Sequence, residues 1–133
     1  MTSANLDIVR SIYADWEHGD YTRTEWADPE IDFEVADGPA PGSASGVDEM
    51  AERFQSILAA WDDWRSAAEE YRELDDERIL VFVRRSGRGR VSGLDLSKMR
   101  NQGAAIYHFS GGKVTKIVLY FDRERALSDL GLD

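Results

Sequence analysis

The chain has 133 residues, no cysteine, and 26 acidic against 16 basic side chains, which gives a formal net charge of −10. This charge disfavours nucleic acid and anionic membrane surfaces as partners, because both would repel the protein. The lack of cysteine excludes a disulfide framework, a thiol nucleophile and a thiolate metal site. No run approaches the roughly 20 apolar residues of a membrane span, so we expect one cytoplasmic domain over residues 1–133 with no membrane partner.

The N-terminal part predicts two helices. Apolar residues recur at helical spacing over residues 4–18, and Gly19 is a natural stop, so we expect an amphipathic helix there. Its apolar stripe consists of Leu6, Ile8, Val9, Ile12, Tyr13 and Trp16. Asp20 is a suitable cap for a second, short helix through Trp26 and Ala27, which Pro29 would end.

A strand, a loop and a third helix are expected next. Apolar and acidic residues alternate over residues 31–35, which predicts a short strand with one polar face. Residues 37–46 hold two prolines and three glycines, so we expect a loop. Asp48 and Glu49 favour the N-terminal end of a third helix. Its buried side is expected to carry Met50, Phe54, Ile57, Leu58 and Trp61.

The rest of the chain predicts strands. Residues 64–74 alternate imperfectly, and residues 79–83 form a continuous apolar run bounded by charge, which is typical of a central strand. Residues 84–90 (RRSGRGR) are expected to continue it as a twisted or bulged ribbon, because glycines inside strand patterns often mark bulges. Residues 92–102 form a polar excursion before the closing segment.

The closing segment predicts an antiparallel hairpin. Two apolar, β-branched and aromatic runs, 105–109 and 114–121, are joined by a short turn at Ser110, Gly111 and Gly112. The charged residues 122–125 follow at the point where a buried strand would reach the rim of a core. Helices that precede a run of strands imply an α+β domain with the sheet curled over the helices.

This order, together with the segments WADPEIDFEV, SGVDEM and HFSGGKVTKIVLYFD, resembles the NTF2-like superfamily, within it the SnoaL-like and ketosteroid-isomerase-like groups. The resemblance spans about Leu6 to Leu127 and rests on a chain-long pattern. It implies an α+β cone, in which a strongly curved antiparallel sheet wraps around three N-terminal helices and leaves a deep apolar pocket. It also implies a homodimer through the outer sheet face. Members include isomerases, polyketide cyclases, dehydratases, epoxide hydrolases and proteins that only bind, so the fold does not fix a reaction.

The isomerase-like pattern points to Glu34 and Tyr13. Glu34 falls where those relatives carry a general base, and a carboxylate that faces an apolar cavity loses hydration and becomes a better proton acceptor. Tyr13 falls where they carry a phenol that donates a hydrogen bond to a developing enolate oxygen. The acid that accompanies this phenol is absent, because the matching position is Ala105. Glu34 also fits the wet face of an edge strand, and Tyr13 also fits an ordinary core.

The cyclase-like and epoxide-hydrolase-like pattern points to Asp122, near the end of the closing strand. A carboxylate there would abstract a proton alpha to a carbonyl or activate water without a metal. His108, one strand over, titrates near physiological pH and is its candidate partner. The alternative is that Asp122 caps a following short helix while His108 points out of the sheet. His108 and Ala105 differ by three positions, so an ideal strand would place them on opposite faces.

Candidate ligand-binding residues are basic or aromatic. A cluster of arginines would orient a carboxylate or phosphate on a ligand, because guanidinium groups bind oxyanions bidentately. Its members are Arg84, Arg85, Arg88 and Arg90. Solvated charge on a protruding ribbon explains the same cluster. The aromatic residues that would line a cavity, or else fill it, are Trp16, Trp26, Trp61, Trp64, Tyr13, Tyr107 and Phe121. Core packing is the expected role of Trp61.

No cofactor or metal is expected. His18 and His108 are the only histidines and form no HxH or HExxH spacing, and no dinucleotide, P-loop or nucleophile-elbow motif is present. The sequence therefore predicts a protein that binds a small apolar or weakly polar molecule, with cofactor-independent proton transfer or hydration as one version. The alternatives are a binding module that lacks catalysis and a solid interaction domain that works through its sheet face.

Overall fold

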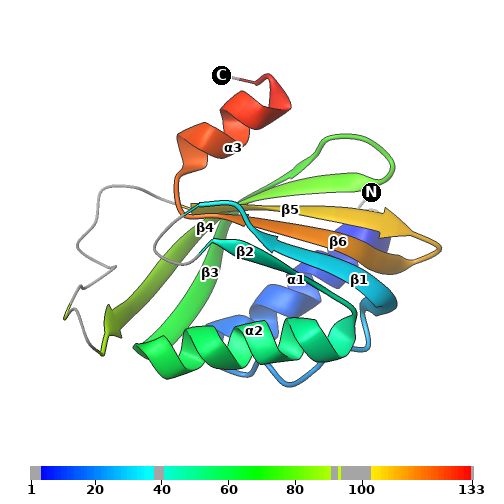
Figure 1. Cartoon of the computed structure of the whole chain (residues 1–133). Coiled ribbons are helices and arrows are strands. Elements are labelled where there is room, and N and C mark those ends of the chain that lie inside the picture. Colours follow the sequence, from blue (N-terminus) through cyan, green and yellow to red (C-terminus); the bar gives the residue numbers. More distant parts are fainter. Residues whose placement is uncertain (1–3, 38–40, 91–92, 94–102, 133) are drawn as a thin grey trace.

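The computed structural model describes residues 4–37, 41–90, 93 and 103–132. Within these residues lie three helices and six strands (Figure 1). In chain order they are α1 (Ala4–Glu17), β1 (Ala27–Val35), β2 (Gly42–Ser45), α2 (Val47–Ala60), β3 (Trp61–Glu73), β4 (Arg78–Gly89), β5 (Gly103–Ser110), β6 (Lys113–Tyr120) and α3 (Arg123–Leu130).

The strands form one curved, open sheet in the order β2-β1-β6-β5-β4-β3. The pair of β1 and β6 is parallel and the other four pairs are antiparallel. Helices α1 and α2 lie on one face, called here the inner face, and α3 lies on the opposite, outer face (Figure 1). The α+β cone is therefore confirmed, with one parallel pair in an otherwise antiparallel sheet.

The main core lies between the inner face and the two helices. Val9 and Ile12 of α1 are at most 1% exposed, as are Phe33 of β1 and Ile117 of β6. Phe54 of α2 packs against Phe33 with 5.0 Å between ring centroids. The amphipathic patterns predicted for residues 4–18 and for the helix after Asp48 thus match α1 and α2, because each buries its apolar stripe on the sheet.

The edge strand β3 contains a bulge that turns two tryptophans to the same side. Its register with β4 shifts between Asp62 and Arg65, and Asp63 has a positive φ of 53°. Side chains normally alternate along a strand, so residues three positions apart point to opposite faces. The extra residue of a bulge shifts this alternation, and two residues three positions apart then point to the same face. Trp61 and Trp64 are accordingly both buried, at 8% and 4% exposure. Trp61 begins β3 instead of ending the buried stripe of the third predicted helix.

Helix α3 covers part of the outer face. Leu80, Ile106 and Val118 of the sheet form a second core cluster, and Leu127 and Leu130 of α3 pack against it. Part of the face expected to form a dimer interface is therefore occupied by the chain's own helix. The homodimer stays a prediction. Within the described segments, no helix combines the length and the apolar character that crossing a membrane requires.

Two predicted elements differ from the structure. The short helix expected after Asp20 is absent, because the chain enters the sheet at Ala27, which pairs with Val114 of β6. The Asp20 carboxylate accepts from the backbone N–H and the hydroxyl of Thr22, at 3.0 and 2.6 Å, as a cap would, but no helix follows it. The expectation of three N-terminal helices is therefore wrong, because the third helix of the fold is α3 near the C-terminus. Within the predicted loop 37–46, β2 pairs with β1. The polar excursion at 92–102 lies outside the described residues except for Gly93.

Replacing Phe33 tests the inner core. Phe33→Ala removes a ring that is fully buried between β1 and α2, so the free energy of unfolding should fall by about 3–5 kcal/mol in urea titrations. The matched control is Glu30→Gln on the exposed part of the same strand, which should change stability by less than about 0.5 kcal/mol. A loss below about 1 kcal/mol for Phe33→Ala would contradict this packing.

Candidate functional site

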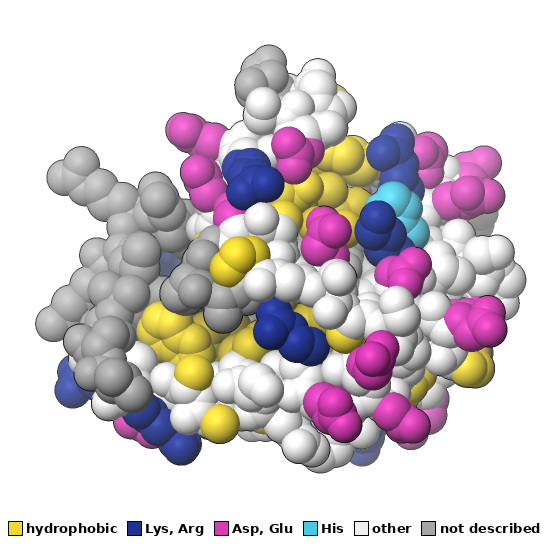
Figure 2. Space-filling model, in the orientation of Figure 1, with side chains coloured by type: hydrophobic (Ala, Val, Ile, Leu, Met, Phe, Trp, Pro, Cys, Tyr) yellow, Lys and Arg dark blue, Asp and Glu magenta, His cyan; other side chains and the backbone are white. Residues whose placement is uncertain are grey.

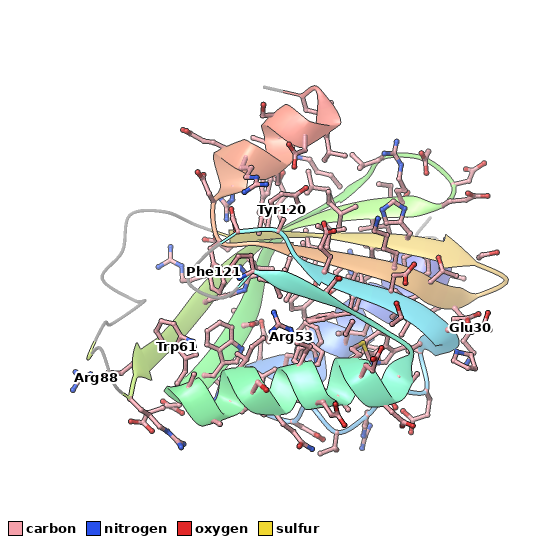
Figure 3. The ribbon with its side chains drawn as sticks, viewed as in Figure 1. Glu30, Arg53, Trp61, Arg88, Tyr120 and Phe121 are labelled. Carbon is pink, nitrogen blue, oxygen red and sulfur yellow. The ribbon has the colours of Figure 1, made fainter. Side chains whose placement is uncertain are left out.

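A small cavity opens between the C-terminal half of α2 and the inner face of the sheet. Its volume is about 80 Å³, and its aliphatic wall consists of Val35, Ile57, Ala60 and Leu119. Figure 3 shows Trp61 at the start of β3 and Arg53 on α2 beside this space, with Phe121 above it. Hydrophobic side chains also reach the surface on this side of the molecule, in yellow at the left of Figure 2. The cavity is thus apolar and partly open.

Three aromatic rings form the rest of the apolar wall. Trp61 and Trp64 lie 5.6 Å apart between ring centroids, and Trp64 meets Phe121 edge to face at 6.2 Å and 78°. The two tryptophans face the cavity together because of the bulge in β3, and Phe121 follows the last residue of β6. Such rings offer flat, rigid surfaces for a planar ligand at little cost in side-chain entropy.

Arg85 brings a buried positive charge to this apolar wall. It is 9% exposed, and its guanidinium group lies 5.2 Å from the centroid of the Phe121 ring. Its Nη1 donates to the carbonyl oxygen of Tyr120 at 2.5 Å and its Nη2 to that of Ala104 at 3.4 Å. Burial lowers the pKa of Arg85 below its ordinary value, yet an arginine stays protonated in a protein.

The backbone makes room for this guanidinium group. A Cβ atom on Gly103 would lie 2.2 Å from Nη1 of Arg85 and 2.8 Å from the Tyr120 carbonyl oxygen. A glycine at the start of β5 is therefore required for Arg85 to reach its place. The neighbouring strand end is held by Asp37, whose carboxylate accepts from the backbone N–H groups of Phe121 and Asp122 at 2.6 and 3.2 Å.

Two buried tyrosines lie deeper in the cone. The hydroxyl of Tyr107 on β5 donates to that of Tyr13 on α1 at 2.9 Å. Burial raises the pKa of both phenols well above 10, and partial burial raises the pKa of Tyr21 to about 12. The positive charge of Arg85 acts against these shifts. Both phenols therefore stay neutral at neutral pH.

The predicted catalytic residues are not brought together. Asp122 follows β6 and caps α3, where its carboxylate accepts from the backbone N–H of Glu124 at 3.0 Å. His108 pairs with Lys116 at the far end of the hairpin, whereas Tyr120 pairs with Ala104 at the near end. The hairpin therefore separates His108 from Asp122, and neither lines the cavity.

Strand parity places Glu34 and His108 on the outer face. The neighbours of Glu34, Phe33 and Val35, belong to the inner core, and Glu34 itself lies in a shallow groove with Arg125. Partial burial, followed by the positive charges of Lys116 and Arg78, lowers the pKa of His108 below 6.5. His108 is therefore neutral at physiological pH and faces away from the cavity.

Of the predicted ligand-binding residues, Phe121 lines the cavity. Trp16 and Tyr107 belong to the inner core cluster. The exposed Arg84 pairs instead with Glu69, with 3.3 Å between Nη2 and Oε2.

Sequence reasoning found part of this lining. Trp61 and Trp64 were among the aromatic residues expected to line or fill a cavity, with core packing preferred for Trp61. Arg84 was selected from the predicted arginine cluster ahead of Arg85, and Arg53 was missed. The available signal was the alternation of side chains along β4, where Ile79, Val81, Val83 and Arg85 share one parity. Among the described residues, no three His, Asp or Glu side chains lie together as metal ligands would.

Comparisons with known proteins identify the fold. A family model described as a SnoaL-like domain matches residues 9–117. Among curated proteins, no significant match was found. An NTF2-like protein of unknown function from Burkholderia pseudomallei K96243 superposes with a TM-score of 0.77 at 21% identity, over 96% of this chain and 97% of that one.

Two further similar structures contain small molecules. A hypothetical protein with a ketosteroid isomerase-like fold from Catenulispora acidiphila DSM 44928, in complex with trimethylamine, has a TM-score of 0.71 at 11% identity, over 96% of this chain and 94% of that one. TerC, co-crystallised with polyporic acid, has a TM-score of 0.74 at 20% identity, over 96% and 98%. At such identities the likeness shows the fold alone.

The buried tyrosines predict a loss of stability at alkaline pH. An unfolded tyrosine loses its proton near pH 10, whereas Tyr13 and Tyr107 keep theirs in the folded state, so their contribution is fully present below pH 10. Above pH 10 each should reduce the free energy of unfolding by up to about 1.4 kcal/mol per pH unit. Urea titrations at pH 9, 10.5 and 11.5 should show a shallower decline for Tyr13→Phe. Equal slopes would contradict the assignment.

Proposed function

We propose that this chain, which belongs to the SnoaL-like domain family, binds a small, flat and largely apolar molecule in the cavity between α2 and the sheet. The observation that carries this proposal is the wall of three rings, Trp61, Trp64 and Phe121, on one side of a partly open space. Sites for small organic ligands are typically concave and apolar, with a few polar groups that set orientation.

The size of the cavity limits the ligand. Its volume of about 80 Å³ is below the roughly 300–1,000 Å³ of pockets that enclose a drug-sized ligand. The enclosed space therefore holds about one aromatic ring, and a second fused ring would extend into solvent. Two similar structures hold organic ligands, trimethylamine and polyporic acid. The aromatic wall of this chain favours a flat ligand.

Binding without carboxylate chemistry is the version that the lining supports best. The polar residues of the cavity wall are Arg53, Ser56 and Arg85, and no Asp, Glu or His among the described residues lines it. Of the predicted bases, Asp122 lies nearest in the chain, directly after Phe121. The acid–base version of the proposal therefore rests on Asp122, whereas Glu34 and His108 serve it less well from the outer face.

Filling the cavity tests the binding proposal. The flat ketone 2-acetylnaphthalene should quench tryptophan fluorescence and raise Tm, because a ligand that binds the folded state stabilises it. Ile57→Trp places an indole in the cavity and should weaken binding at least tenfold. The matched control Gln55→Trp adds the same ring to the exposed side of α2 and should leave affinity unchanged. Equal affinity of both variants would place the ligand elsewhere, and absence of any quenching would refute the proposal.

Asp122→Asn separates binding from catalysis. Asparagine is as good an N-cap as aspartate, so α3 should keep its stability, with a change in Tm of less than about 2 °C. If Asp122 is a general base, turnover of a ketone or epoxide substrate that the wild type converts should fall at least 100-fold while affinity persists. Preserved turnover would remove Asp122 from the proposal, and the binding function would stand without it.

A further inference from the structure

Arg85 carries a buried charge that no carboxylate of the described residues neutralises. Its partners among the described residues are two backbone carbonyl oxygens and the face of one aromatic ring. The ion pairs among the described residues involve other arginines, and Arg84, its neighbour, pairs with Glu69. A buried ion without a counter-ion is costly, because the protein interior replaces water poorly. This site therefore gains more from an incoming anion than an exposed arginine would.

The nearest negative charge does not satisfy Arg85. The charge of Asp37 acts on Arg85, but no ion pair joins the two side chains within 4.0 Å among the described residues. The Asp37 carboxylate instead accepts from the backbone N–H groups of Phe121 and Asp122. Asp37 thus serves the end of β6, and the guanidinium group remains a donor.

Arg85 also has hydrogen-bonding capacity left. A guanidinium group carries five N–H donors in a planar fork, and two donor–acceptor pairs are formed with Tyr120 and Ala104. Arg85 lines the cavity, and its guanidinium group lies 5.2 Å from the centroid of the Phe121 ring, so this donor group borders the aromatic wall. Planar oxyanions match this fork in shape and charge better than neutral carbonyl groups do.

A second guanidinium group lines the same cavity from the opposite side. Arg53 projects from α2 near β2, where a Cβ atom on Gly42 would lie 3.1 Å from its Nη2. The cavity thus contains two basic side chains and no acidic one among the described residues, although the whole chain has a net charge of −10. A wall that presents guanidinium groups and no carboxylate favours an anion over a cation.

We propose that the ligand of this cavity is a flat aromatic molecule with one delocalised oxyanion, a carboxylate or an ionised acidic enol, which Arg85 binds while the ring lies against Trp64 and Phe121. The inference rests on the proposed function, because it specifies the ligand of that same cavity. Arg53 closes the other side of the charged group.

Matched pairs of ligands test this inference on the unchanged protein. Calorimetry first compares 2-naphthoate with 2-naphthamide, which have the same shape but differ in charge. It then compares 2-hydroxy-1,4-naphthoquinone, which is ionised at pH 7.5, with neutral 1,4-naphthoquinone. The anion of at least one pair should bind ten or more times tighter than its neutral partner. A preference in the first pair alone identifies carboxylates, and one in the second alone identifies acidic enols. Equal affinities in both pairs would overturn the inference and leave the apolar binding function intact.

Two variants assign the preference to Arg85. Arg85→Met keeps the length and apolar stem of the side chain, so it should bind the neutral ligands within threefold of wild type while the preference for the anion falls below twofold. The control Arg84→Met removes the same charge one residue away on the exposed side, and it should keep the preference. An Arg85→Met variant that retains the full preference would overturn the inference.

A second variant distinguishes a loss of folding from a loss of anion binding. If Arg85→Met does not fold, Arg85→Lys replaces it, because a single ammonium keeps the charge but loses the planar fork and should reduce the anion preference by three- to tenfold. An Arg85→Lys variant with wild-type preference would contradict the role of the fork. If neither the anions nor the neutral ligands bind the wild type, both this inference and the proposed function fail.

Discussion

The burial of one guanidinium group constrains the structure around the cavity. Arg85 can lie under the curved end of the sheet because Gly103 leaves space and because the carbonyl oxygens of Tyr120 and Ala104 accept its hydrogen bonds. These contacts join β4, β5 and β6 at one place, and Phe121 covers the charge as β6 ends. The cavity therefore owes its position to where a charged side chain can be accommodated in an apolar interior.

The curvature of the sheet gives the cavity its aromatic wall. The bulge at Asp63 turns Trp61 and Trp64 to one side, and Gly87 on β4 lets the bulged backbone approach, since a Cβ there would lie 3.2 Å from the carbonyl oxygen of Asp62. Deeper in the cone, Tyr107 and Tyr13 are hydrogen-bonded to each other and supply no charge. Positive charge thus meets flat apolar surface at one boundary, which is the chemistry expected for an amphipathic aromatic ligand.

The sequence predicted the architecture better than the site. The hairpin and the helices α1 and α2 have strong periodic signals, so their existence followed from local pattern. The run from Ile79 to Val83 is apolar throughout, so its pattern does not show which alternate residues face inward. Arg84 was therefore predicted to bind the ligand, although Arg85 is the residue that faces inward. The direction of Trp61 depends on a bulge, which is a property of strand pairing and has no local signal. The outer-face placement of Glu34 agrees with the polar face that alternation over residues 31–35 predicted, whereas its match to a general base came from the resemblance alone.

The most direct measurement follows the arginine side-chain Nε–Hε signals in a ¹H–¹⁵N spectrum during titration with 2-naphthoate. The account predicts that the signal of Arg85, assigned by its absence in Arg85→Lys, shifts in step with the quenching of tryptophan fluorescence, while that of Arg84 stays in place. Quenching that saturates without any change in the Arg85 signal would contradict the claim that a buried guanidinium group anchors the ligand.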